Sequence, residues 1–198
     1  GEVSLKKATE LDSANYWYRD RLALAYSVKG KREEAIGEYE KLSLQYPKKI
    51  DSYYSLTNLY LSQGDLDKAV KALDTIEELS GKTDATVLTK YRIYLQQQKQ
   101  EEALNELKEY SEEYSSPQVL TMLGDHEMGM SNDSLALAYY EEALFLDSAY
   151  SPALLGKAEV YRLTRNYPKY FEQLDAVMTN ENVMPRAKTD YMSRVLQH

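Results

Sequence analysis

The residues with the greatest capacity for chemistry form one short run, Asp125-His126-Glu127, in which an imidazole lies between two carboxylates. Such side chains bind divalent metals and transfer protons. The run falls in a segment with helical periodicity, and consecutive residues of a helix project about 100° apart. The three side chains therefore cannot converge on one ion, and we interpret them as a surface cluster.

The rest of the sequence contains no strong catalytic motif. There is no cysteine, which excludes disulfides and thiolate chemistry. A phosphate-binding glycine loop and a Gly-x-Ser-x-Gly nucleophile turn are also missing. Asn132-Asp133-Ser134 fits the glycosylation acceptor pattern, but a pattern of three residues is common by chance. We therefore expect no catalytic residue, no bound metal and no cofactor.

The composition is that of a soluble protein, with 43% hydrophobic and 28% charged residues among 198. The longest apolar runs span only a few residues, which predicts no direct membrane insertion. The net charge of −8 argues against binding to nucleic acid and to anionic lipid. The chain begins with Gly1 instead of Met, which suggests a piece of a longer protein. A signal peptide could have been removed, so the sequence leaves cytoplasm and bacterial periplasm or cell envelope open.

Residues of the same type recur along the sequence at a nearly constant interval. Tyr26, Tyr60 and Tyr94 are each 34 residues apart, and so are the turn residues Gly30 and Gly64. Alanines follow the same interval at Ala35, Ala69 and Ala103 and then, 33 residues later, at Ala136. A fixed period of this length indicates stacked repeats of one supersecondary unit.

The pattern resembles the tetratricopeptide repeat, which reads Trp-x2-Leu-Gly-x2-Tyr, then Ala-x3-Phe, then Pro. Numbered from Tyr16, the first unit fills the family's characteristic places with Leu22, Ala23, Tyr26, Ala35, Tyr39 and Pro47. Later units depart from it, since Lys90 replaces a leucine, Glu127 a tyrosine and Tyr170 an alanine. These departures leave the register of the third and fourth units open.

The resemblance implies an all-α fold, a right-handed superhelix of antiparallel helix pairs that runs through residues 1–198 as a single array. Residues 1–13 would be the second helix of a partial repeat. Full repeats would follow at 16–49, 50–83, 84–116, 117–150 and 151–183, with a capping helix at 184–198 that ends near Gln197. A single amphipathic pair cannot bury its apolar face alone, so neighbouring pairs must stack.

The resemblance also implies that the first helices of successive units line a concave groove in which partners bind. The groove-facing candidates are Trp17, Arg21, Tyr54, Asn58, Leu88, Arg92, Met122, Asp125, Glu159 and Arg162. Such a mixture of apolar and charged side chains suits an extended or helical peptide. Each apolar member could equally be packing between neighbouring first helices. Chaperone-binding members use a basic clamp, whose places here carry Asp20, Ala85 and Thr89, so we expect no carboxylate clamp.

We therefore expect a non-catalytic scaffold that binds a peptide or partner protein. Two alternatives remain open. The first is self-association into a homo-oligomer through exposed array ends, because Leu5, Ala8 and Leu11 would lack a partner helix in the first half-unit. The second is a regulatory or sensor module of a larger protein whose active domain lies elsewhere.

Overall fold

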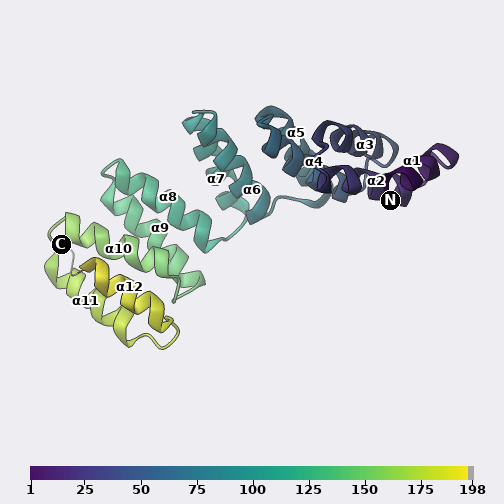
Figure 1. Cartoon of the computed structure of the whole chain (residues 1–198). Coiled ribbons are helices and arrows are strands. Elements are labelled where there is room, and N and C mark those ends of the chain that lie inside the picture. The colour runs from purple at the N-terminus through teal and green to yellow at the C-terminus, as the bar shows by residue number, and fades with distance from the viewer. Residues whose placement is uncertain (196–198) are drawn as a thin grey trace. The chain divides into compact units, whose positions relative to one another are not determined.

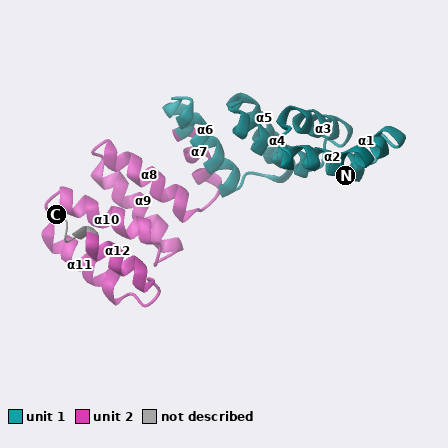
Figure 2. Ribbon diagram, viewed as in Figure 1, with its two compact units in different colours: residues 1–103 teal, residues 104–198 magenta. Residues whose placement is uncertain are grey.

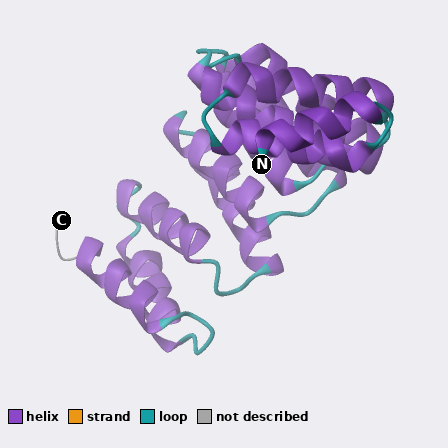
Figure 3. Cartoon of the chain, turned by 45° about the vertical axis from the view of Figure 1, so that its right-hand side comes forward, coloured by secondary structure: helices purple, strands orange, loops and turns teal. Residues whose placement is uncertain are grey.

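The protein is all-α in residues 1–195, the part of the chain that the structure, a computed structural model, describes (Figures 1 and 3). The helices are α1 (Glu2–Leu11), α2 (Tyr16–Val28), α3 (Arg32–Gln45), α4 (Ile50–Gln63), α5 (Leu66–Ser80), α6 (Asp84–Gln96), α7 (Gln100–Glu113), α8 (Pro117–Gly129), α9 (Asp133–Leu146), α10 (Ser151–Leu163), α11 (Tyr167–Thr179) and α12 (Pro185–Val195). The expected end of the last helix near Gln197 lies outside the described residues.

Five helical hairpins share one turn geometry. The turn residue has a positive φ in each, at Gly30 (73°), Gly64 (83°), Gln98 (62°), Ser131 (61°) and Arg165 (55°). The amide of the next residue then donates to a carbonyl five residues back, which closes the end of the first helix. The acceptors are Tyr26, Tyr60, Tyr94, Glu127 and Tyr161, at donor–acceptor distances of 2.8–2.9 Å.

These turn hydrogen bonds give the register of the repeat. Tyr26, Tyr60 and Tyr94 occupy equivalent places in successive hairpins, as the spacing predicts. Glu127 takes the same place in the next hairpin, so the step across the third and fourth units is 33 residues. The tyrosine at this place is therefore not needed for the turn, because only its backbone carbonyl takes part.

In four of the five hairpins, the second helix has a small residue where it packs against the first. Ala35, Ala69, Ala103 and Ala136 are all completely buried. Close approach of two helices requires small side chains at the crossing. In the last hairpin the place belongs to Tyr170, which is buried in one cluster with Leu154, Ala158 and Tyr161.

The chain divides into two compact units, residues 1–103 and residues 104–198, which are considered separately (Figure 2). In the first unit, α1 is attached through Glu2, whose carboxylate lies 2.6 Å from Lys29 Nζ and 2.7 Å from Lys31 Nζ. The second unit has its core between α8, α9, α10, α11 and α12, with Tyr140 and Val177 among its buried residues.

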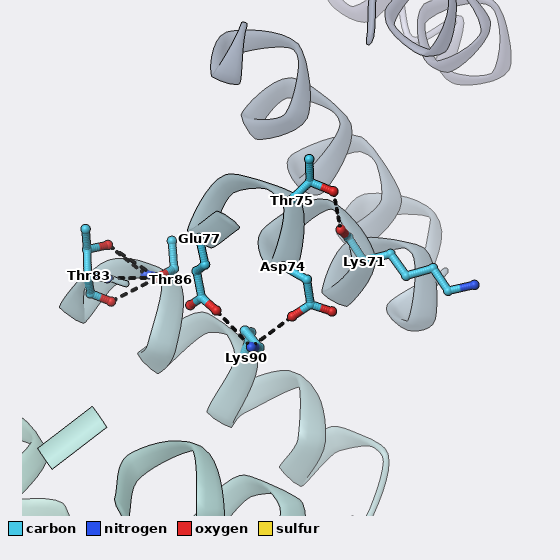
Figure 4. Close-up of polar contacts among 7 residues, drawn as sticks. All are labelled: Lys71, Asp74, Thr75, Glu77, Thr83, Thr86 and Lys90. Carbon is cyan, nitrogen blue, oxygen red and sulfur yellow. Dashed lines mark hydrogen bonds and ion pairs between the residues drawn. The ribbon is translucent and has the colours of Figure 1, made fainter. Parts of the chain in front are cut away.

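Lys90 explains one departure from the repeat pattern. It is almost completely buried on α6, and its ammonium lies 2.9 Å from Asp74 and 3.0 Å from Glu77, both on α5 (Figure 4). A buried ammonium requires carboxylate partners. The apolar contact that a leucine would make here is therefore replaced by an ion pair between consecutive helices.

Candidate partner-binding faces

In the first unit, four of the candidates lie on α2 and α4, which both pack against α3. Trp17 and Arg21 project from α2, and Tyr54 and Asn58 project from α4; all four are exposed. Residues four apart share one side of a helix, so each pair forms a continuous strip. The start of α2 is held by Asn15, whose side-chain oxygen accepts hydrogen bonds from the amides of Trp17 and Tyr18.

Trp17 is 63% exposed although it is the only tryptophan in the chain. Its ring meets the buried Tyr16 ring edge-on, with centroids 5.5 Å apart. Lys49, the residue that precedes α4, places its ammonium 4.0 Å from the Tyr16 centroid and 5.5 Å from that of Trp17. The aromatic surface is therefore fixed in place by a cation–π contact that the sequence analysis did not anticipate.

Charges on the α2–α4 face are mixed. Asp20 is half-buried beside Arg21, and burial raises the pKa of its carboxyl above the ordinary value. Arg21 and Lys49 act in the opposite direction, whereas Asp51 at the start of α4 acts with burial. The face thus combines exposed aromatic rings with two cations and two carboxylates.

The two candidates on α6 differ in accessibility. Arg92 is exposed, whereas Leu88 is 6% exposed and belongs to the buried residues of the helix. Leu88 therefore presents almost no surface to a partner, and Arg92 is the accessible member of this helix.

The second unit brings the remaining candidates together on α8 and α10. Met122 is half-buried and Asp125 exposed on α8, while Glu159 and Arg162 are half-buried on α10. The guanidinium of Arg162 binds the Glu159 carboxylate through two hydrogen bonds of 2.6 and 2.8 Å. These two charges therefore largely compensate each other.

Tyr140 is a residue of this face that sequence analysis missed. It belongs to α9 and is completely buried, but its hydroxyl donates a 2.7 Å hydrogen bond to Asp125 Oδ1. The ring needs the space left by two helix glycines: a Cβ atom on Gly124 or Gly156 would lie 2.7 or 2.4 Å from it. Burial raises the pKa of Tyr140, and the nearby carboxylates of Asp125 and Glu159 raise it further, so the hydroxyl remains a donor.

The side chains of Asp125, His126 and Glu127 diverge in the structure. Asp125 contacts Tyr140, whereas the buried Glu127 accepts a 2.7 Å hydrogen bond from the Asn132 amide, and His126 is exposed. Within residues 1–195, no group of three or more histidine, aspartate or glutamate side chains is arranged to hold a metal ion. None of the described helices combines the length and the apolar character needed to cross a membrane.

Comparison with known proteins relates the chain to helical repeat proteins. The family model of anaphase-promoting complex (cyclosome) subunit 3 matches residues 28–110, somewhat less than half of the chain. Sequence comparison with curated proteins gives no match.

Among solved structures, the chain is similar to YrrB, a TPR protein described as having an unusual peptide-binding site (TM-score 0.61, 15% identity, 100% of this chain and 98% of that one). It is also similar to MamA, with a TM-score of 0.58 and 16% identity over 86% of this chain and 98% of that one. The similarity to PilF of Pseudomonas aeruginosa has a TM-score of 0.56 and 20% identity over 94% of this chain and 90% of that one.

The recurring hairpins and these similarities show that the chain has a fold of the tetratricopeptide-repeat type. Its helices form antiparallel pairs in which a small or well-accommodated residue marks each crossing. Stacked repeats of this architecture create extended surfaces.

Proposed function

We propose that the chain is a non-catalytic scaffold that binds a peptide or partner protein through the exposed faces of its first helices. The observation that carries the proposal is the α2–α4 face, where Trp17 stays 63% exposed while Tyr16 and Lys49 fix its ring. Exposed, rigidly held aromatic side chains are typical anchors of binding surfaces. Tyr54 extends the surface along α4 with a 40% exposed ring.

Peptide binding can be tested on the full chain with an immobilised library of short synthetic peptides. The fluorescence of Trp17 then reports binding in solution, because the chain has no other tryptophan. We expect Trp17→Ala and Tyr54→Ala each to weaken the best peptide about tenfold or more, as for aromatic anchors in other interfaces. Arg92→Glu extends the test to α6.

Phe145→Ala provides the matched control. Phe145 is 89% exposed, but it lies on the second helix α9, which carries none of the candidate residues. This change should leave binding unaltered. A library that yields no bound peptide, or binding that ignores all three face variants, would refute the proposal.

Self-association is the second candidate function, and the N-terminal end of the first unit favours it. Leu5 is half-buried against the α2–α3 hairpin, but Val3 and Leu11 on α1 are 82% and 81% exposed. Exposed apolar side chains on a terminal helix can pair with a second copy. Sedimentation velocity at two well-separated concentrations tests this: a monomer at both would eliminate it.

A further inference from the structure

Asp125 is held in one geometry by the core of the second unit. One carboxylate oxygen accepts the 2.7 Å hydrogen bond from Tyr140, whose buried ring fills the space between Gly124 and Gly156. Within residues 1–195, the other oxygen has no hydrogen-bond or ion-pair partner. A carboxylate that is fixed and only half-satisfied is a preorganised acceptor.

Within residues 1–195, no cation is paired with Asp125. Burial raises the pKa of its carboxyl, and the Tyr140 hydrogen bond is the one influence in the opposite direction. Arg162, on the neighbouring helix α10, is occupied by its two hydrogen bonds to Glu159. His126 follows Asp125 on α8, but consecutive residues project about 100° apart and its side chain is exposed. The charge of this face is therefore negative.

Apolar side chains flank the carboxylate. Met122 and Met128 lie three residues before and after Asp125 on α8, so all three share one side of the helix. Both methionines are half-buried, and the Met128 sulfur lies 3.9 Å from the Tyr140 hydroxyl. Methionine adapts its shape to the group it contacts and offers a suitable surface for an aliphatic stem.

We propose that Asp125 receives a lysine or arginine side chain of a peptide bound to the second unit, and that Tyr140 is a positioning residue for this contact. The aliphatic stem lies against Met122 and Met128, and the cationic head reaches the free Asp125 oxygen. Long basic side chains combine such an apolar stem with a charged head. The inference rests on the proposed peptide-binding function and adds the chemistry of one partner residue.

The test uses the full chain and the same immobilised peptides, with each position varied in turn. We expect lysine and arginine to be enriched at one position. Asp125→Asn should weaken the best lysine peptide about tenfold or more, because a charge-assisted hydrogen bond is lost. The same peptide with methionine at that position should bind both proteins equally.

Tyr140→Phe separates positioning from a purely structural role. It keeps the ring and removes the hydroxyl, so the protein should retain its helical circular dichroism. If Tyr140 acts through Asp125, Tyr140→Phe weakens the lysine peptide, spares the methionine peptide and adds nothing in an Asp125→Asn background. If Tyr140 has only a structural role, Tyr140→Phe should weaken the binding of both peptides alike. That result would overturn the assignment of Tyr140 as a positioning residue.

Glu172→Gln is the control, because Glu172 is an exposed acid on α11. It should leave the lysine preference intact. Bound peptides without a basic preference, or a preference that survives Asp125→Asn, would overturn this inference and leave the proposed function standing. If the chain binds no peptide at all, both this inference and the proposed function are refuted.

Discussion

Gly156 shows how one residue decides whether a candidate side chain is positioned. A Cβ atom at this place would lie 2.4 Å from Tyr140 Cζ, and the fully buried ring has no room to withdraw. We therefore expect Gly156→Ala to lower the free energy of unfolding by roughly 1–3 kcal/mol through overpacking. Urea denaturation measures this as a lower midpoint at unchanged slope.

Gly37→Ala is the opposite case. Gly37 lies inside α3, and a Cβ atom there would have no neighbour within 4 Å. Alanine should therefore stabilise the protein by about 0.5–1 kcal/mol, the ordinary helix preference over glycine. A midpoint that Gly156→Ala leaves unchanged or raises would show that the proposed close packing of Tyr140 is wrong.

The sequence predicts residues best where the repeat imposes one requirement on every unit. Ala35 and Ala69 were expected at close helix crossings, and both are completely buried. For Leu88 the sequence left exposure and packing open, and it did not predict the contact of Tyr140 with Asp125. The burial of Leu88 depends on its neighbours' volumes, and the contact of Tyr140 depends on two glycines in other helices. The repeat period shows which positions are equivalent in successive units. The shape of each site depends on residues that differ between the units.

At the scale of the elements, the sequence indicated the turns only where glycine marks them. Gly30 and Gly64 were expected between paired helices, but Gln98, Ser131 and Arg165 adopt the same left-handed conformation. This conformation costs a residue other than glycine about 1–2 kcal/mol. The side chains of these three residues therefore do not predict it. The recurring hydrogen bond to the carbonyl five residues earlier in the chain holds them there.

The contact between α5 and α6 allows a quantitative prediction. Lys90 and Glu77 have side chains that are 7% and 8% exposed, and they pair at 3.0 Å (Figure 4). Lys90→Met leaves the buried Glu77 carboxylate without its ammonium and should destabilise the protein by roughly 3–5 kcal/mol. The double variant Lys90→Met/Glu77→Leu should recover most of this loss, because both charges are removed. Chemical denaturation of the four proteins in the cycle gives the coupling energy.

A matched ion pair exists in the second unit. Lys157 occupies the place in its repeat that Lys90 occupies in its own, and it lies 2.9 Å from Glu141. Here the side chains are 19% and 57% exposed, so Lys157→Met should cost no more than about 1 kcal/mol. Equal losses for Lys90→Met and Lys157→Met would show that burial does not control these pairs.

For the whole molecule, the helix pairs with extensive contacts within each unit are neighbours in sequence or separated by one helix. Stability in such a chain is approximately a sum of repeat and nearest-neighbour contributions. A local defect should therefore destabilise the adjacent helices and have little effect on the stability of helices farther along the chain. This property follows from the repeat period and could be expected before the structure was known.

Hydrogen exchange on two reciprocal variants tests that locality. Ala69 and Ala136 are completely buried at equivalent crossings in different units, and leucine at either should overpack its hairpin by roughly 1–3 kcal/mol. Ala69→Leu should accelerate amide exchange in α4 and α5 while α10 and α11 keep their protection. Ala136→Leu should do so in α8 and α9 and leave α2 and α3 unchanged. Faster exchange along the whole chain in both variants would mean that the helices unfold as one cooperative body, because each defect would then lower the same global free energy.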